Sequence, residues 1–382
     1  MEKLGGKHVL FVVTEDWYFC SHRLPLALAL IKAGCKVSLA TRINRHGERI
    51  RSHDIAVFNI FFRRGSLNPF MDFRTFSALY NLYRREQPDV IHHVALKPVI
   101  VGSLSAIFAR SPHVVNALTG LGYVFSSDSW NIRLLRKIIL RLFRIILNRP
   151  GWAVIFQNSG DMEELSHSGI ISGGRAALIK GSGVDLRHYC PGDFLPGVPI
   201  AMFAGRLLRI KGVEEFVQAC RLINRNGQRI RCVLVGFLDT VNPSVLDHRL
   251  IDKWTNEGLV EWWGFREDMP EVINQSRLVC LPTYYGEGLP KVLLEAAACG
   301  RPVVATDIPG CREIVRDGET GLLVPPRDYK ALAAAIERLV ADPDLCLRMG
   351  ENARRLVDTE FSVEKVNQET LKLYERLLYD SN

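Results

Sequence analysis

The feature that most constrains the fold is an alternation of short apolar runs with longer stretches of helical periodicity, which continues along most of the chain. Strands buried on both faces of a sheet appear as nearly unbroken Val, Ile and Leu runs. The segments VLFVV (9–13) and VIHHVA (90–95) have this character. Strands of this kind that alternate with helices are typical of a parallel, doubly wound α/β sheet.

The pattern occurs in two blocks. The strands predicted for the first are His8–Val13, Lys36–Thr41, Val57–Phe62, Asp89–Ala95, His113–Leu118, Trp152–Asn158 and Ala176–Lys180. Helices are predicted between them, notably at Leu24–Lys32, Phe73–Glu86 and Pro98–Ala109. The strands predicted for the second block are Ile200–Ala204, Arg231–Gly236, Val260–Gly264, Leu278–Pro282, Pro302–Ala305 and Gly321–Val324. A helix at about 363–378 closes the chain.

Three prolines and two glycines between residues 189 and 199 indicate a linker between the blocks. We therefore expect a domain at 1–190, a second at 191–360, and a final helix at 361–382 that packs back toward the first. Two open α/β domains in tandem bind ligands at the carboxyl ends of their strands, here facing each other across a cleft.

Composition and charge narrow the class of protein. The nine cysteines are scattered without a C-x-x-C pair, no apolar run approaches the roughly 18 residues that span a bilayer, and residues 1–13 do not resemble a signal peptide. These features favour a cytoplasmic protein.

The two halves of the chain differ in net charge. Residues 1–190 carry 25 Lys and Arg against 13 Asp and Glu, a net +12, whereas residues 191–382 carry 24 against 28, a net −4. The first half is suited to an anionic partner. No nucleic-acid-binding module is recognisable in it, so we expect no nucleic acid.

The most informative segment, YGEGLPKVLLEAAACG (285–300), follows a predicted strand. Pro290 suits the first turn of a helix and Gly300 its end, so the free amides of Lys291 and Val292 form an anion site suited to a diphosphate. Glu287 before the helix and Glu295 inside it can bracket that diphosphate by accepting sugar and ribose hydroxyls. Either glutamate alone fits a surface position, but Glu295 lies among apolar residues, where an unpaired carboxylate is costly.

A second cluster, GRLLRIKG (205–212), follows the first strand of the second block. Arg206 and Lys211 can converge on the same diphosphate, Arg as a planar fork and Lys as a point charge. A solvated basic loop explains the two residues equally well.

Together these motifs, with GRPVVAT (300–306) and DGETGLLV (317–324), resemble glycosyltransferase family 4 over nearly the whole chain. The resemblance implies a GT-B architecture of two Rossmann-like domains, retention of anomeric configuration, and no metal or other cofactor. It implies that Arg206 and Lys211 neutralise the departing diphosphate, with Glu287 on the donor sugar and Glu295 on the ribose. The donor-binding positions that it gives are Arg206, Lys211, Phe265, Arg266, Glu287, Gly288, Leu289, Lys291, Val292 and Glu295, with Arg206, Lys211 and Glu287 as catalytic.

Within the family, SHRLP (21–25) and SLNPF (66–70) resemble bacterial enzymes that extend undecaprenyl-diphosphate-linked glycans. This resemblance implies transfer of a hexose or N-acetylhexosamine from a UDP-sugar to a lipid-linked or cell-surface glycan, in polysaccharide biosynthesis. Two departures matter. The loop expected at 14–19 lacks the glycine pair of many relatives, and residues 117–122 provide no His or Glu as a base. Retaining transfer needs no side-chain base if the departing phosphate takes the acceptor proton.

Residues 131–148, NIRLLRKIILRLFRIILN, predict an amphipathic helix without an acidic residue. Its five basic residues fall within about 140° of arc, opposite the apolar ones. This pattern is typical of a helix on an anionic bilayer, and equally of one whose apolar face packs on the sheet. The two fit together if the apolar side packs on the core and the basic side meets lipid head groups. We therefore expect a peripheral protein on the inner face of the membrane.

The acceptor-side candidates are His22, Arg23, Lys97 and Thr119, which come after predicted strands of the first half. The first three are expected to bind the diphosphate of a lipid-linked acceptor, whereas His92 and His93, inside a strand, are expected to be packed. Two other activities compete. A sugar-nucleotide epimerase of GT-B fold would act without an acceptor. An NAD-dependent oxidoreductase would need G-x-G-x-x-G at its first helix, and the first loop has no glycine.

Overall fold

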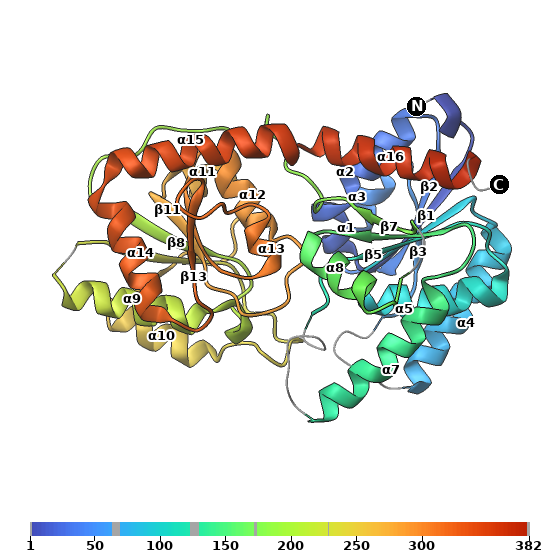
Figure 1. The fold of residues 1–382 in the computed structure, drawn as a ribbon, viewed down its shortest axis with the longest axis horizontal. Helices are drawn as coiled ribbons and strands as arrows, with labels where there is room; N and C mark the ends of the chain where they lie inside the picture. Colours follow the sequence, from blue (N-terminus) through green and yellow to red (C-terminus); the bar gives the residue numbers. More distant parts are fainter. Residues whose placement is uncertain (1, 63–68, 123–129, 172–173, 228, 380–382) are drawn as a thin grey trace. The chain divides into compact units, whose positions relative to one another are not determined.

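The computed structural model describes residues 2–62, 69–122, 130–171, 174–227 and 229–379. By internal contacts the chain divides into two units (Figure 1). The first is Met1–Ser182 with Val363–Asn382, and the second is Gly183–Ser362. Each is described by itself.

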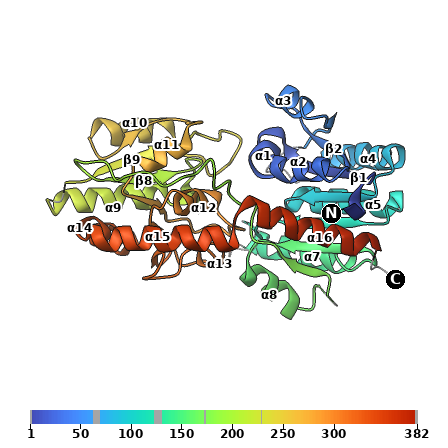
Figure 2. The ribbon, with the colours of Figure 1, turned by 90° about the horizontal axis from the view of Figure 1, so that it is seen from above.

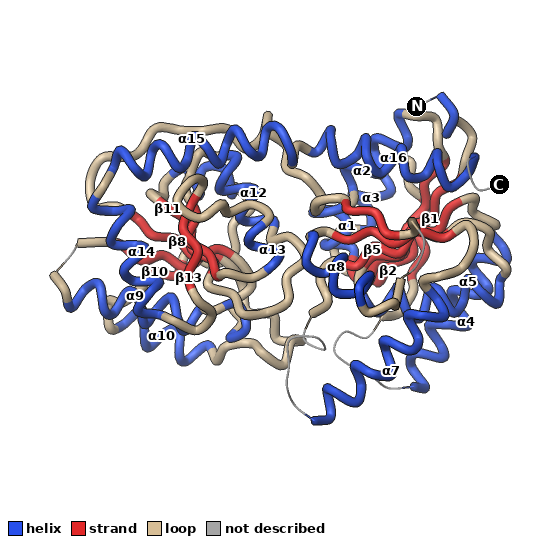
Figure 3. The backbone as a smooth tube through the Cα atoms, in the orientation of Figure 1, coloured by secondary structure: helices blue, strands red, loops and turns tan. Residues whose placement is uncertain are grey.

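The first unit is built on a seven-stranded parallel sheet of order β3-β2-β1-β4-β5-β6-β7, which runs through its middle with helices on both sides (Figure 3). The strands are β1 (His8–Glu15), β2 (Lys36–Arg42), β3 (Ala56–Asn59), β4 (Val90–Val94), β5 (Val114–Leu118), β6 (Trp152–Phe156) and β7 (Ala176–Leu178). The helices are η1 (Glu2–Leu4), α1 (Asp16–His22), α2 (Leu24–Lys32), α3 (Gly47–Arg51), α4 (Pro69–Glu86), α5 (Leu96–Ala109), α7 (Trp130–Ile146), α8 (Ser159–His167) and α16 (Val363–Tyr379).

Alternate residues of the central strands pack on opposite faces of this sheet. Phe11 of β1 belongs to the core beneath α1, α2 and α16, whereas Leu10 belongs to the core beneath α4 and α5. A third cluster joins α5, α7 and α8 to the sheet. The predicted strands of the first half are confirmed within a few residues.

The C-terminal helix α16 lies beside α2 within the first unit (Figure 2). The Asn367 Nδ2 group donates to the Pro25 carbonyl at 3.3 Å, and the Tyr374 hydroxyl is hydrogen-bonded to Nδ1 of His92 in β4. Val366, Leu373 and Leu377 are buried against the same face of the sheet. The helix is therefore an integral layer of the first unit.

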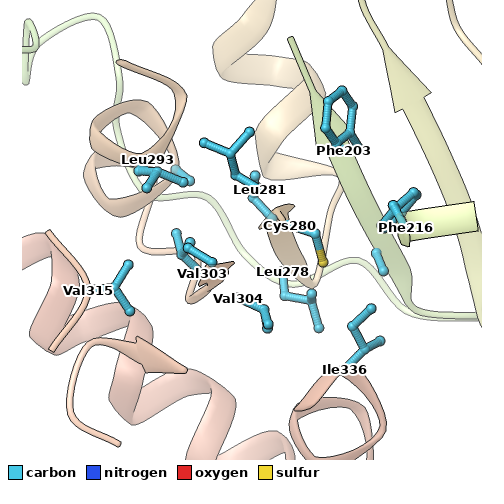
Figure 4. Packing of buried hydrophobic residues seen from close by; sticks show 14 of the residues in the cluster. Phe203, Phe216, Leu278, Cys280, Leu281, Leu293, Val303, Val304, Val315 and Ile336 are labelled. Atoms are coloured by element: carbon cyan, nitrogen blue, oxygen red, sulfur yellow. The ribbon is translucent and has the colours of Figure 1, made fainter. Parts of the chain in front are cut away.

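The second unit has a six-stranded parallel sheet of order β10-β9-β8-β11-β12-β13. The strands are β8 (Ile200–Ala204), β9 (Arg231–Val235), β10 (Glu261–Trp262), β11 (Leu278–Leu281), β12 (Val303–Thr306) and β13 (Gly321–Val324). The helices are η2 (Arg209–Lys211), α9 (Val213–Arg225), α10 (His248–Asn256), α11 (Met269–Asn274), α12 (Lys291–Ala298), α13 (Pro309–Arg312), α14 (Tyr329–Ala341) and α15 (Pro343–Glu360). Side chains of β8, β11 and β12 meet those of α9, α12 and α14 in its core (Figure 4).

The segment predicted as a linker is folded onto the second unit. Arg301, 2% exposed, donates from Nη2 to the carbonyls of Gly192 and Asn274, each at 2.8 Å. The Phe194 ring lies within 4.4 Å of the guanidinium carbons of both Arg277 and Arg301. The prolines and glycines correctly predicted irregular backbone, but hydrogen bonds from Arg301 fix this backbone against the second unit.

One local prediction is wrong. The loop expected at 14–19 does not exist, because β1 continues to Glu15 and α1 begins at Asp16. The Asp16 carboxylate, fully buried, accepts from the backbone amides of Asn44 and His46 at 2.7 and 2.9 Å. Within the described ranges, no helix combines the length and apolarity that crossing a membrane requires.

Candidate functional site

The donor candidates gather at the carboxyl edge of the second sheet, where the strand order reverses. In this order β8 and β11 are neighbours, although helices and two other strands separate them in sequence. Open α/β sheets bind ligands in the crevice at such a switch point. Arg206 and Lys211 follow β8, and Glu287 and Lys291 follow β11.

Glycines allow the two loops to touch. Gly212, with φ of 77°, lies so close to the end of β11 that a Cβ there would be 2.1 Å from the Pro282 carbonyl oxygen. Gly310 in α13 lies equally close to the later part of the loop, where a Cβ would be 2.6 Å from the Glu287 carbonyl oxygen. The loop from Pro282 to Gly288 is thus packed closely against Gly212 after η2 and against α13.

Lys211 and Glu287 form an ion pair through Glu287 Oε1, and their side chains are only 15% and 12% exposed. The Thr283 hydroxyl lies 3.1 Å from the same oxygen and 3.1 Å from the Ile210 carbonyl, so these two acceptors share its single proton. A residue that was not predicted, Thr283, therefore joins the η2 loop to Glu287. The arrangement fixes both a cation and a carboxylate at the switch point.

The helix after Glu287 begins one residue later than expected. Pro290 is the N-cap with extended backbone (φ −68°, ψ 116°), and Lys291 is the first helical residue. No side chain caps this end, and Gly288 and Leu289 just before it are buried. The helix ends at Ala298, before Gly300 with φ of 65°, as predicted. The predicted anion site of this first turn stays a prediction, with its amides at the carboxyl end of β11.

Glu295 is buried (8% exposed) and has two partners within the second unit. Its Oε1 accepts from the Tyr189 hydroxyl at 2.8 Å and lies 3.2 Å from Lys291 Nζ. Burial and the neighbouring charge of Glu295 raise the pKa of Tyr189 far above its usual value, so the phenol stays a donor. The two partners fix the position of the carboxylate at the helix face.

Arg206 is paired with a residue that the sequence analysis missed. Its Nη1 lies 2.9 Å from Oδ2 of Asp239, which is 6% exposed and follows β9. The sequence signal that could have identified Asp239 is a carboxylate that comes shortly after a strand ending at the same edge of the sheet. The pair fixes the Arg206 guanidinium at the sheet edge, which a solvated loop would not do.

Phe265 and Arg266 follow β10 at the same edge. The Phe265 ring is 63% exposed and meets the Phe237 ring edge-on, with centroids 5.9 Å apart. Arg266 is paired with Asp268 through two hydrogen bonds, one of them 2.7 Å from Nε to Oδ1. An exposed ring beside polar groups can stack on a planar base.

The acceptor candidates in the first unit differ from one another. The His22 ring stacks on Tyr18, with ring centroids 4.1 Å apart. The Lys97 Nζ atom lies 2.6 Å from Asp72 Oδ1. Thr119 follows β5 and is half-buried. Arg23 lies between α1 and α2 and is 4% exposed. The expectation that all of these face an open site at the sheet edge is wrong for Arg23, which is in the interior.

His92 and His93 are fully buried, as expected. His93 is hydrogen-bonded to Asn116 and Tyr83 at 2.8 and 3.0 Å, and burial lowers its pKa to about 4. Of the motif at 66–70, residues 66–68 lie outside the described residues, so the structure is silent on them.

Known families match both units. The model for "Glycosyl transferases group 1" matches residues 194–356, and the model for "Glycosyl transferase 4-like" matches residues 8–149. The chain is a glycosyltransferase, with a 4-like first domain and a group 1 second domain. A curated relative of this transferase is the N,N'-diacetylbacillosaminyl-diphospho-undecaprenol alpha-1,3-N-acetylgalactosaminyltransferase of Campylobacter jejuni. The two are 27% identical over 369 residues, which cover 93% of this chain and 95% of the relative.

Solved structures confirm that the transferase has the GT-B fold. Sucrose-phosphate synthase from Thermosynechococcus elongatus matches with a TM-score of 0.81 at 23% identity, over 98% of this chain and 100% of the other. Anabaena HepE in complex with UDP-glucose matches with a TM-score of 0.76 at 20% identity, over 96% and 98% of the two chains. The predicted fold and family are confirmed.

Proposed function

We propose that this transferase moves a hexose or N-acetylhexosamine from a UDP-sugar to a lipid-linked glycan, with retention of configuration. The observation that carries the donor half is the switch point of the second unit. There, Lys211 and Glu287 are in contact beside the uncapped first turn of α12. The crystallised HepE complex with UDP-glucose and the undecaprenol-linked substrate in the name of the Campylobacter relative support the choice of donor and acceptor.

Each donor residue has a role that follows from its surroundings. Lys211, Arg206 and the amides of Lys291 and Val292 hold the diphosphate, because they present cations and free donors at one sheet edge. Glu287 accepts sugar hydroxyls beside Lys211. Glu295, fixed by Tyr189, accepts ribose hydroxyls, and Phe265 with Arg266 frames the base.

The reaction is proposed to run without a metal ion. When the bond from the sugar to phosphate breaks, negative charge grows on the leaving diphosphate, and Arg206 and Lys211 stabilise it. Preorganised donors of this kind act without reorganisation at the moment of reaction. The departing phosphate oxygen then takes the acceptor proton, so no side-chain base is required.

Ligand-detected NMR of the full chain against UDP, GDP and NAD tests the donor assignment. We expect UDP to bind, Glu295→Ala to weaken it, and the exposed helical control Glu351→Ala to leave it unchanged. Stronger binding of NAD or GDP, or UDP binding indifferent to Glu295, would contradict the proposal. Consumption of a UDP-sugar that depends on a membrane extract would separate the transferase from an epimerase.

We also propose that the transferase works on an anionic membrane surface through α7. The apolar side of this helix was predicted to pack on the core. In the structure, however, Leu134, Ile138 and Ile145 are 51%, 53% and 62% exposed. They form one stripe beside the exposed Lys137 and Arg141, while Phe143 and Ile146 are buried. An apolar stripe flanked by cations fits the interface of an anionic bilayer.

Flotation with vesicles tests this surface. Wild type is expected to float with phosphatidylglycerol vesicles at low salt, and a variant with Lys137→Glu and Arg141→Glu is expected to stay behind. Arg225→Glu on α9 of the second unit is the matched control. Equal flotation of all three proteins would remove α7 from the membrane assignment.

A further inference from the structure

The Thr283 side chain is fully buried just after β11, between the loop that follows β8 and the loop that carries Glu287. Its hydroxyl oxygen has two acceptors at the same distance, since the Ile210 carbonyl and Glu287 Oε1 each lie 3.1 Å away. A threonine hydroxyl has a single proton, so it donates fully to only one of these acceptors at a time. Rotation about the Cβ–Oγ1 bond redirects this hydrogen bond without moving any heavier atom.

The surroundings hold the Thr283 oxygen in place whichever acceptor it serves. The Tyr285 amide donates to this oxygen at 3.3 Å, which ties it to the start of the Glu287 loop. The Ile210 carbonyl also accepts from the Tyr284 amide, at 3.2 Å. That carbonyl therefore keeps a donor when the Thr283 hydroxyl turns to Glu287, so the turn does not leave it unpaired.

Lys211 is needed by two anions. In the free protein it is paired with Glu287 Oε1, the oxygen that Thr283 also contacts, and both charged side chains are largely shielded from water. In the proposed function, the leaving diphosphate draws the same ammonium group. Withdrawing one partner of a shielded ion pair leaves an uncompensated charge and is strongly destabilising. The Glu287 carboxylate therefore needs another donor when a diphosphate engages Lys211.

We infer that Thr283 is a positioning residue for Glu287. Its hydroxyl, shared between two acceptors in the free protein, donates to Glu287 Oε1 when a diphosphate engages Lys211. The redirected hydrogen bond keeps the carboxylate partnered and in place to accept sugar hydroxyls. This inference rests on the proposed function and deepens it, because it explains how Lys211 serves both anions. Thr283 acts through Glu287 and does not itself bind the donor.

Calorimetric titration of the full chain with UDP tests the inference, because UDP provides the diphosphate. Thr283→Val keeps a similar shape and removes the hydroxyl. It is expected to weaken UDP binding about tenfold, the effect of losing one hydrogen bond to a charged group. Thr283→Ser keeps the hydroxyl and should bind UDP nearly as tightly as wild type. Thr255→Val, at an exposed position of α10, is the matched control and should leave the affinity unchanged.

A second background separates action through Glu287 from general support of the loop. Glu287→Gln removes the charge that competes for Lys211, so this variant should bind UDP at least as tightly as wild type. If Thr283 acts through the carboxylate, adding Thr283→Val to Glu287→Gln should change the UDP affinity far less than the same substitution does in wild type. Equal losses in the two backgrounds would show that Thr283 only supports the loop, and would overturn the inference.

Unfolding temperatures of the unliganded variants check that each one folds. If Thr283→Val is too unstable to titrate, Thr283→Ala takes its place, and the comparison between the two backgrounds stays the same. Binding of UDP to wild type with no loss in the Thr283 variant would overturn the inference alone. Failure of wild type to bind UDP would instead contradict the proposed function.

Discussion

The two sheets share the strand order 3-2-1-4-5-6 in each unit's own numbering, with a seventh strand added in the first, yet their units pair buried cations differently. In the second unit Lys211 is paired with Glu287, and Arg206 with Asp239. In the first unit the buried Arg23, between α1 and α2, has an Nε without a hydrogen bond. Cations at the edge of the second sheet are thus held by carboxylates, whereas the buried cation of the first unit lies in the interior. The difference predicts that mutations change catalysis most at the paired charges of the second unit.

The largest effect is expected at Lys211. Lys211→Ala removes a cation from the leaving diphosphate and should lower kcat by about 10²–10³. It also removes the cation that is paired with Glu287, so Glu287→Gln is combined with it to separate the two losses. Rates of transfer at saturating UDP-sugar measure the effect. If Lys211→Ala raised KM and left kcat unchanged, Lys211 would act in the ground state alone.

A smaller effect is expected where Asp239 positions Arg206. Asp239→Asn keeps the shape but removes the charge that holds the guanidinium, and kcat/KM should fall about tenfold, as for loss of one hydrogen bond between charged groups. Arg206→Ala measures the whole contribution of the arginine. If the two changes were additive in the double variant, Asp239 would not act through Arg206.

The smallest effect is expected at Tyr189. Tyr189→Phe removes one of the two partners of Glu295 and should weaken UDP binding several-fold while kcat stays near that of wild type. Titration with UDP checks the affinity. Because Lys291 still pairs with Glu295, an affinity as low as that of Glu295→Ala would show that Tyr189 touches the nucleotide itself.

The sequence predicted what depends on local periodicity and chain order. The strands of both sheets, the start of α2 at Leu24 and the gathering of the donor motifs at one edge follow from apolar runs and turn residues. Partners that come from distant segments were not predictable. Asp239 meets Arg206 across 33 residues and Tyr189 meets Glu295 across 106. No periodicity in the sequence encodes such a pairing.

Two further differences between the prediction and the structure also come from contacts with distant segments of the chain. The Pro- and Gly-rich segment at 189–199 looked free because its own residues are poor formers of regular structure, but Arg301 anchors it from elsewhere in the chain. Leu134 and Ile138 were assigned to the core because a helical projection shows only which side a residue occupies. How wide the covered side is depends on the neighbouring helices, and these leave the two residues exposed.

The glycines that confine the Glu287 loop have a consequence for mutational scans. Gly212 and Gly310 leave no room for a Cβ, because the nearest carbonyl oxygens would lie at 2.1 and 2.5 Å from it. A library of single substitutions, scored by activity, should therefore find both positions as intolerant as Lys211. Only a parallel score of cellular abundance would distinguish them. Proteins substituted at Lys211 should still accumulate in the cell, whereas proteins substituted at Gly212 or Gly310 should not.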